Sequence, residues 1–342
     1  MSFERFYGNP SIVRTLDGMI RRDKIPQTIL VSGPEGVGKA TLARRFAAAL
    51  IGDPGKIEHD DLSLPENASL ISDREKWPSE KRSDDPLLFS SHPDFITFPP
   101  DGPLKVLSIQ QMRVLRERAN FKPLKGRYRV FLIDRLDKAN EQAANSLLKT
   151  LEEPPDHLIL FVTAQNPYDL LPTIRSRAVM LQLASLGSED MHAFAVERGL
   201  AASDRRLGLA AGRPGIAVTL DLDVYDKRRN AMLRLLNVAS GRGQFADWAK
   251  MADSVGAGRS DKLDSYLEVL YILLSDVVAL QHGVGTVRNT DIRADLAAIA
   301  RQVDFEWLRR AVAKVDELVE FQRRNIQKSI ALDALVSSLR PA

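Results

Sequence analysis

The feature that most constrains the fold is a glycine-rich stretch between a short apolar run at 28–31 and a helix-like pattern at 42–50. It consists of Gly33, Pro34, Glu35, Gly36, Val37, Gly38, Lys39, Ala40 and Thr41. A strand, a glycine-rich loop and a helix in this order are typical of the phosphate-binding P-loop, because the glycines let backbone N–H groups turn toward an anion. The stretch predicts a nucleotide site or a remnant of one. A glycine-rich turn without a ligand is the alternative.

The end of this stretch departs from a complete nucleotide site. Lys39 can reach the outer phosphates, and the start of the following helix adds partial positive charge. Ala40 stands where a Ser or Thr hydroxyl normally holds Mg²⁺, and Thr41 comes one residue late, so that its side chain points elsewhere. We therefore expect ATP only in a weak or vestigial site.

Short apolar runs alternate with helix-like patterns as far as residue 185. Runs at 95–98, 130–133, 158–162 and 179–183 predict strands, and Ser108 with Gln111 has the spacing of a capping box that opens a helix. This alternation predicts an α/β fold, with a parallel sheet and helices on both faces. After residue 185 the patterns are helical. We expect a P-loop domain at 1–185, a small helical lid at 186–228 and a C-terminal helical domain at 229–342.

Residues 52–91 differ from their surroundings. Asp, Glu, Ser, Pro and Lys dominate, periodicity disappears, and Trp77 is the one Phe, Trp or Tyr side chain before Leu87. This composition predicts a mobile polar insertion or a long surface loop.

Composition excludes several classes of site. The 342 residues include no cysteine, which excludes disulfides, thiolate metal sites and cysteine nucleophiles. Five scattered histidines make a histidine metal site improbable, and a net charge of +3 does not by itself indicate a nucleic-acid partner. The N-terminus lacks the apolar core of a signal peptide, and no apolar run is long enough to span a bilayer. We expect a soluble, cytoplasmic protein without a membrane partner.

Two residues follow the apolar run at 130–133. Asp134 has the place of the acid that helps to hold Mg²⁺ in P-loop NTPases, and an acid that merely caps the next loop is the less favoured alternative. A hydrolysing ATPase of this class needs a carboxylate at the following position to orient the attacking water, and Arg135 cannot act as a base at neutral pH. Together with Ala40, Arg135 predicts poor or absent hydrolysis.

A cluster of motifs in the following segment resembles a known family. The run 145–155 reads NSLLKTLEEPP, and it is followed by AQNP at 164–167, LPTI at 171–174 and SRA at 176–178. Together these runs resemble the signature of bacterial clamp-loader subunits, the AAA+ family of the DNA polymerase III complex, and the resemblance covers nearly the whole chain. It implies an AAA+ P-loop domain, a helical lid and a C-terminal collar that oligomerises with other subunits.

Within this family the chain is more similar to the delta-prime type than to the ATP-hydrolysing gamma/tau type. Gamma/tau members carry a hydroxyl residue, an acidic pair and a lid arginine where this chain has Ala40, Asp134-Arg135 and Gly215. The segments 211–217 and 325–335 are similar to the delta-prime lid and terminal helix. The resemblance implies a largely non-hydrolysing subunit that assembles with gamma/tau and delta subunits to load the sliding clamp onto primed DNA.

One family feature is absent. Both subunit types commonly carry a four-cysteine zinc module after the P-loop helix, and the polar stretch 52–91 has its place in this chain without a cysteine. We therefore predict no zinc and no other metal.

The resemblance also implies two roles in catalysis. The arginine of the family's Ser-Arg-Cys motif reaches the ATP of the neighbouring subunit, and its counterpart in Ser176-Arg177-Ala178 is Arg177. An isolated Ser-Arg would more often be a surface arginine paired with an acid. Gln165 and Asn166 have the position of the polar sensor, although Asn166 before Pro167 is also a turn former.

Three alternatives remain open at this stage. The basic loop at 121–129 could contact DNA phosphates, but a solvated charged loop is the favoured interpretation. The chain could be an active gamma/tau-like ATPase, which needs Asp137 to replace the acid absent at Arg135. It could also be a P-loop scaffold unrelated to replication, which the run at 145–155 disfavours.

Overall fold

The computed structural model describes residues 3–201, 204–257, 263–321 and 328–340. Its contacts divide the chain into two compact units. Unit 1 comprises Met1–Ala202 and Gly212–Thr219, and unit 2 comprises Ser203–Ala211 and Leu220–Ala342. The segment expected to form the lid, 186–228, is distributed over both units, and the three-part division stays a prediction.

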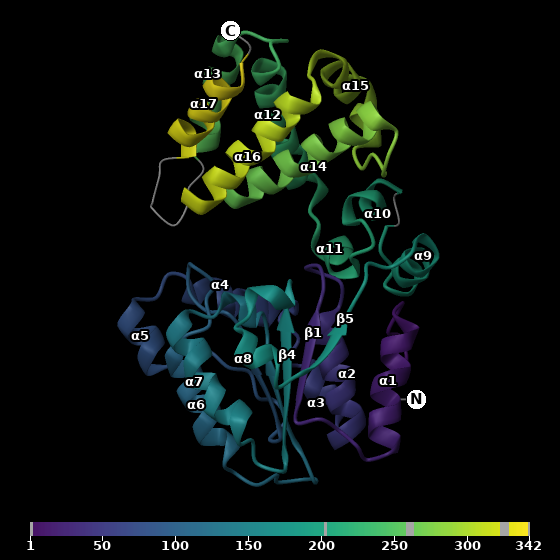
Figure 1. The fold of residues 1–342 in the computed structure, drawn as a ribbon, viewed down its shortest axis with the longest axis vertical. Coiled ribbons are helices and arrows are strands. Elements are labelled where there is room, and N and C mark those ends of the chain that lie inside the picture. The colour runs from purple at the N-terminus through teal and green to yellow at the C-terminus, as the bar shows by residue number, and fades with distance from the viewer. Residues whose placement is uncertain (1–2, 202–203, 258–262, 322–327, 341–342) are drawn as a thin grey trace. The chain divides into compact units, whose positions relative to one another are not determined.

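Unit 1 is built on a five-stranded parallel sheet (Figure 1). In the described residues the strand order is β2-β3-β4-β1-β5. The strands are β1 (Thr28–Ser32), β2 (Phe95–Phe98), β3 (Arg129–Ile133), β4 (Leu158–Ala164) and β5 (Val179–Gln182). The first four are fully buried because helices cover both faces, which explains why they are continuous apolar runs. The predicted α/β fold with a parallel sheet is confirmed.

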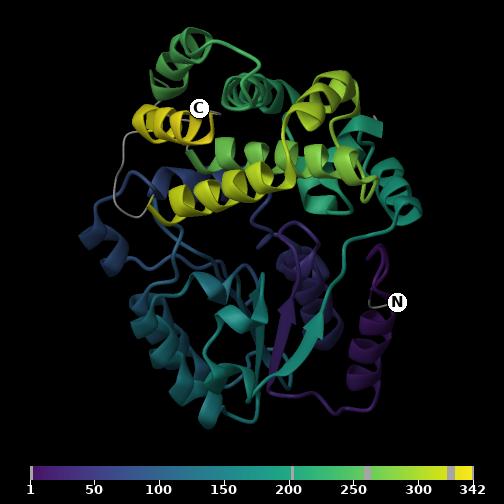
Figure 2. The same cartoon turned by 45° about the horizontal axis from the view of Figure 1, so that its top comes forward.

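Helices pack on both faces of this sheet (Figure 2). Leu115 of α6 (Ile109–Ala119) and Leu147 of α7 (Glu141–Glu152) pack against β3 and β4 on one face. On the other face, Phe46 of α2 (Lys39–Ile51) contacts Phe161 of β4, and α1 (Pro10–Arg21) packs against α2. The predicted capping box is present at the start of α6, where Ser108 and Gln111 bond reciprocally.

The prediction of an irregular loop at 52–91 is wrong. The segment contains three short helices, α3 (Pro54–Glu58), α4 (Pro65–Arg74) and α5 (Ser79–Asp84). Ion pairs and isolated buried side chains such as Ile57, rather than an apolar stripe, hold it, so hydrophobic periodicity could not reveal it. The Arg44 side chain, which is buried on α2, pairs with Glu58 and Asp61.

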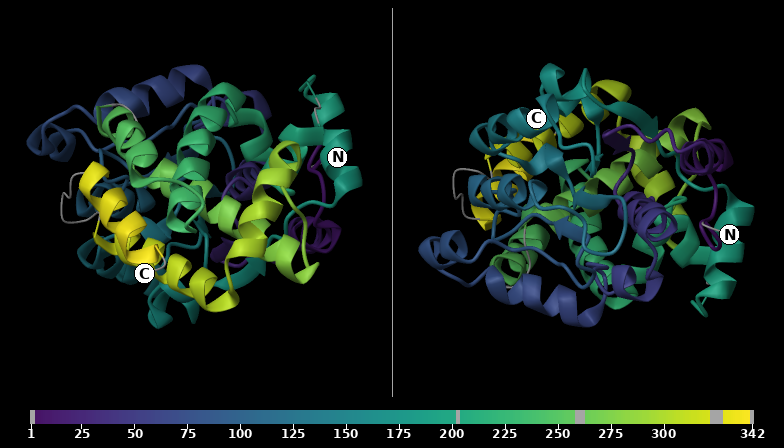
Figure 3. Two further views of the ribbon diagram at one scale, coloured as in Figure 1. Left: turned by 90° about the horizontal axis from the view of Figure 1, so that it is seen from above. Right: turned by 90° about the horizontal axis from the view of Figure 1, so that it is seen from below.

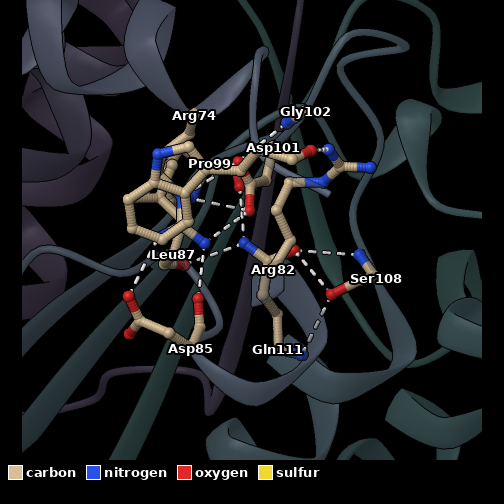
Figure 4. Close-up of polar contacts among 10 residues, drawn as sticks. Arg74, Arg82, Asp85, Leu87, Pro99, Asp101, Gly102, Ser108 and Gln111 are labelled. Carbon is tan, nitrogen blue, oxygen red and sulfur yellow. Dashed lines mark hydrogen bonds and ion pairs between the residues drawn. The ribbon is translucent and has the colours of Figure 1, made fainter. Parts of the chain in front are cut away.

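The centre of this insertion is the buried side chain of Arg74 (Figure 4). Its guanidinium bonds to the carboxylates of Asp101 and Asp85 and stacks on Trp77, 4.5 Å from the ring centroid. Nearby, Gln111 donates to the carbonyls of Leu87 and Pro99. The insertion is therefore tied to the start of α6 by buried polar bonds.

Shorter elements complete unit 1. They are the 3₁₀ turns η1 (Leu136–Lys138) and η2 (Pro167–Asp169) and the helices α8 (Pro172–Arg175), α9 (Ser188–Glu197) and α11 (Pro214–Thr219). Both turns and α8 follow the carboxyl ends of β3 and β4, where ligands of open parallel sheets bind.

In its described residues, unit 2 is entirely helical, as the patterns after residue 185 predict. Its elements are α10 (Asp204–Ala210), α12 (Leu222–Ala239), α13 (Phe245–Ala257), α14 (Leu263–His282), η3 (Thr290–Ile292), α15 (Arg293–Gln302), α16 (Phe305–Phe321) and α17 (Lys328–Leu339). Helix α14 packs against α12, α15 and α16, and these helices can be followed from green to yellow in Figure 3. The part of the predicted terminal segment at 325–327 lies outside the described residues.

The interior of unit 2 also holds a buried polar network. The buried carboxylate of Asp276 accepts hydrogen bonds from the backbone N–H groups of Arg288 and Asn289, and Asn289 accepts from the hydroxyl of Tyr225.

Across the described residues, no helix is both long and apolar enough to cross a membrane.

Candidate functional site

The predicted P-loop lies at the carboxyl end of β1, and α2 begins at Lys39. Two of its glycines are required by their surroundings. Gly33 has a φ of +144°, and a Cβ there would lie 2.4 Å from the carbonyl oxygen of Leu183. Gly36 has a φ of +78°, and a Cβ there would lie 2.7 Å from the side chain of Ile216. The glycines thus permit both the left-handed turn and close packing.

The other residues of the stretch support the start of α2. Val37 is buried beneath the loop, and Gly38 is the N-cap of α2 with a φ of +102°. Ala40 is half-buried in the first turn and offers no oxygen. The hydroxyl of Thr41, one residue after the usual position, accepts from Nη2 of Arg44 at 3.5 Å.

The Lys39 side chain is buried and bonds to its own loop. Its Nζ donates to the carbonyl oxygens of Gly33 at 2.7 Å and Pro34 at 2.8 Å. Burial lowers the pKa of this ammonium below its ordinary value, and the carboxylates of Asp134 and Glu35 oppose that shift. Two of the three ammonium donors are therefore used within the P-loop.

Glu35 joins the P-loop to two neighbouring strand ends. Its Oε1 lies 3.1 Å from Nη1 of Arg135, and its Oε2 accepts from Nε2 of Gln165 at 2.9 Å. We call Glu35, Arg135 and Gln165 the Glu35 clasp. The structure thus brings together a P-loop residue, the position of the missing catalytic acid and a predicted sensor residue.

Asp134 is held by a residue that the sequence analysis missed. The hydroxyl of Thr163 donates to Oδ1 of Asp134 at 2.6 Å and accepts from the backbone N–H of Arg135 at 2.8 Å. Burial raises the pKa of the Asp134 carboxyl, which disfavours the anion that a Mg²⁺ ion would need. A hydroxyl within the apolar run of β4 was the only available signal for Thr163.

The start of α11 lies directly on the P-loop. The backbone N–H of Gly215 donates to the carbonyl oxygen of Gly36 at 2.8 Å, and a Cβ at Gly215 would lie 3.0 Å from that oxygen. A lid arginine is expected at this position in gamma/tau members, and glycine allows close backbone contact instead.

The groups around the P-loop fit Mg²⁺-ATP only in part. The glycine turn and helix start fit a phosphate group, since they orient backbone N–H groups. The hydrolytic parts do not fit, because Ala40 has no hydroxyl, burial raises the pKa of Asp134 and Arg135 replaces the acid. No catalytic step through Mg²⁺-ATP in this pocket follows from these residues. Among the described residues there is also no cluster of three or more His, Asp or Glu side chains arranged to hold a metal ion.

Arg177 lies just after α8 and is held by two contacts. Its Nη2 lies 3.1 Å from Oε1 of Glu152 at the end of α7, and its Nη1 donates to the carbonyl oxygen of Thr173 at 3.0 Å. The side chain is 36% exposed. Pairing with an acid is what the surface-arginine alternative expects. It is equally compatible with an arginine finger, an arginine that reaches the ATP of the neighbouring subunit, so the role of Arg177 stays a prediction.

Asn166 has the geometry of the turn-forming alternative. Its side chain accepts from the backbone N–H of Tyr168 at 3.0 Å and caps η2. Of the predicted sensor pair, only Gln165 takes part in the Glu35 clasp in the described contacts.

The basic loop at 121–129 is fixed by carboxylates. Asp94, which is buried, accepts from the backbone N–H groups of Leu124 and Lys125 at 2.8 Å each. Nζ of Lys125 lies 3.0 Å from Asp53, and Arg127 pairs with Asp23. Contact with DNA stays a prediction, and these ion pairs match the favoured interpretation of a solvated charged loop.

Comparison with protein families identifies the chain's relatives. The family model described as "DNA polymerase III, delta subunit" matches residues 8–187, and its C-terminal counterpart matches residues 223–332. The chain belongs to the clamp-loader subunit family of DNA polymerase III. Its parallel sheet and P-loop are accordingly those of an AAA+ domain, as the resemblance implied.

Individual relatives carry two subunit names. This clamp-loader chain is 27% identical to DNA polymerase III subunit gamma/tau of Mycobacterium tuberculosis over 89% of its own length and 46% of that protein. It is also 27% identical to subunit delta' of Escherichia coli over 67% of its own length and 68% of that protein. The chain therefore spans about half the length of the gamma/tau relatives it matches.

A solved structure of a gamma subunit-related protein from Thermotoga maritima is 16% identical and covers 95% of this chain with a TM-score of 0.43. A likeness at this level carries no argument about the choice between delta-prime and gamma/tau.

Proposed function

We propose that this chain is a delta-prime-type subunit that hydrolyses little or no ATP itself and supplies Arg177 to the ATP site of a neighbouring gamma/tau subunit. The observation that carries the proposal is the Glu35 clasp. Arg135, at the position of the catalytic acid, forms an ion pair with the P-loop itself. A guanidinium held in this way cannot accept a proton from water.

Two further features support a non-hydrolysing pocket. Ala40 offers no hydroxyl for Mg²⁺, and Gly215 lies on the P-loop backbone at the expected place of a lid arginine. If ATP binds, Gly36, Gly38 and Lys39 hold its phosphates without turnover.

This chain then contributes to clamp loading through Arg177 on its surface and through its C-terminal helices. Arg177 stabilises the transition-state charge on ATP bound by the neighbour, an effect worth about 10³ to 10⁵ in rate in other NTPases. The C-terminal helices of 229–342 form the collar with gamma/tau and delta subunits. The assembly opens the sliding clamp and places it on primed DNA in the cytoplasm.

The test is the Arg177→Ala variant, purified and mixed with gamma/tau and delta subunits. We expect the complex to assemble with unchanged stoichiometry by size-exclusion chromatography with light scattering. Its clamp- and DNA-stimulated ATP hydrolysis should fall. Normal hydrolysis in a normally assembled complex would contradict the finger role, and failure to assemble would assign Arg177 to the interface.

A second candidate is an active gamma/tau-like ATPase. It is favoured by the length of the gamma/tau match, 89% of this chain against 67% for delta'. It requires Asp137, whose carboxylate accepts from the backbone N–H of Gln165 at 3.3 Å, to act as the missing acid. Hydrolysis by the isolated chain that is lost in Asp137→Asn would establish this candidate.

A further inference from the structure

The guanidinium of Arg177 is fixed at two points by its own chain. Glu152 accepts from Nη2, and the carbonyl oxygen of Thr173 accepts from Nη1. A guanidinium has five N–H donors, so three remain for another ligand while both contacts are kept. The ion pair therefore orients Arg177 without exhausting its capacity to bind an anion.

The position of Glu152 makes its pairing with a cation favourable. It is the last residue of α7, and the C-terminus of a helix carries partial negative charge, so a second negative charge is unfavourable there. Glu153 follows at the C-cap and adds a further acid. An arginine beside this helix end offsets the repulsion, and the same arginine donates to the carbonyl oxygen of Thr173 in the short helix α8.

We propose that Glu152 is a positioning residue that holds the Arg177 guanidinium in the orientation in which it meets the phosphates of a nucleotide bound by the neighbouring subunit, an inference that rests on the proposed finger role. Arginine carries substantial rotamer entropy, and a side chain that is already ordered loses less on meeting its ligand. Removing Glu152 releases Arg177, which then spends much of its time in unproductive rotamers.

The experiment has two readouts, which use Glu152→Ala, Glu152→Gln and the matched control Glu153→Gln. The first is NMR relaxation of the Arg177 side-chain Nε–H group in the full isolated chain. The second is steady-state ATP hydrolysis by the complex with gamma/tau and delta subunits. The hydrolysis assay is repeated for each variant in an Arg177→Ala background, where a residue that acts through Arg177 has nothing left to position.

We expect Glu152→Ala to increase the mobility of the Arg177 side chain and to lower kcat about threefold, with little change in KM, as is reasonable for an exposed ion pair. Glu152→Gln, which keeps an acceptor oxygen, should recover part of both effects, and Glu153→Gln should change neither. In the Arg177→Ala background Glu152→Ala should have no additional effect.

Unchanged mobility of Arg177 in Glu152→Ala would overturn the positioning role, and so would a rise in kcat, which would make Glu152 a restraint. An equal loss of kcat with and without Arg177 would assign Glu152 to the general stability of α7. Increased mobility combined with normal hydrolysis in Arg177→Ala would refute the finger role instead, so the two failures are distinguishable.

Discussion

Two arginine–glutamate pairs of unit 1 have the same nitrogen–oxygen distance and different surroundings. Arg135 pairs with Glu35, and Arg177 pairs with Glu152, each with a nitrogen–oxygen distance of 3.1 Å. Arg135 is 24% exposed and its carboxylate partner belongs to the P-loop, whereas Arg177 is 36% exposed and its partner ends a helix. The first pair connects the phosphate loop to the edge of the sheet, and the second holds a cation at the surface.

The comparison indicates how a P-loop domain can lose one catalytic function and keep another. Replacing the acid by Arg135 gives the pocket a cation that the loop's own Glu35 neutralises. The backbone of this arginine is fixed too, because its φ is +56° and its N–H is bound by Thr163. The backbone N–H of Arg177 donates only to the nearby carbonyl oxygen of Ile174, at 3.2 Å, and its side chain retains donors for a partner.

The largest expected effect separates the two arginines by function. Arg177→Lys keeps the charge but loses the planar fork, so stimulated ATP hydrolysis by the assembled complex should fall roughly tenfold or more. Arg135→Lys should leave hydrolysis within about twofold, because under the proposed function its pocket does not turn over. If the two variants lost equal steady-state ATP hydrolysis, the two arginines would not differ in function as the comparison states.

The next effect concerns stability. Lys39→Met removes a buried ammonium that bonds to two carbonyl oxygens, and the free energy of unfolding should fall by about 1–3 kcal/mol. Arg177→Met removes a partly exposed pair and should cost less than about 1 kcal/mol. Urea denaturation followed by circular dichroism measures both. A larger cost for Arg177→Met would mean that its pair, rather than the buried lysine, stabilises unit 1.

A smaller effect is expected on nucleotide affinity. Glu35→Gln removes a negative charge from the phosphate loop, so binding of a fluorescent ATP analogue should tighten about threefold at low salt. Glu117→Gln, at an exposed position of α6, is the matched control. Weaker binding in Glu35→Gln would show that the Glu35 clasp supports the loop in a binding-competent form.

The smallest effect is on proton binding by Lys39. Its pKa should lie below 10.5, and Glu35→Gln should lower it further, because the Glu35 carboxylate favours the ammonium form. The folded chain then releases this proton at a lower pH than the unfolded chain, so its contribution to stability rises with pH between the two pKa values. A ¹³C NMR titration of the lysine Cε signals measures the shift. A pKa that stays at or above 10.5 would mean that the neighbouring carboxylates outweigh the effect of burial on Lys39.

Local patterns predict much of the fold. The strands of unit 1 are short apolar runs, and the capping box at Ser108 depends on residues three positions apart, so both can be read directly from the chain. The helices at 52–91 could not be read in this way, since their stability depends on Arg74 bonding to Asp101, which is 27 residues distant. Patterns of apolar residues contain no information on such a bond.

The candidate site, too, could be predicted from the sequence only in part. The P-loop and the arginine of the Ser-Arg motif were predicted because each is contiguous in sequence. The Glu35 clasp was not, because Glu35, Arg135 and Gln165 come from three separate strand ends that only the sheet order brings together. Glu152 lies within the run at 145–155 that carries the family resemblance, but its contact with Arg177 depends on how α7 and α8 pack.

The central claim is that this chain acts on a neighbour's ATP and not on its own. The most direct measurement compares ATP hydrolysis by the purified chain with hydrolysis by gamma/tau plus delta subunits, with and without this chain. The account predicts no turnover by the chain alone and higher clamp- and DNA-stimulated turnover when it is added. Rapid turnover by the chain alone would contradict the account and establish an active motor despite Ala40 and Arg135.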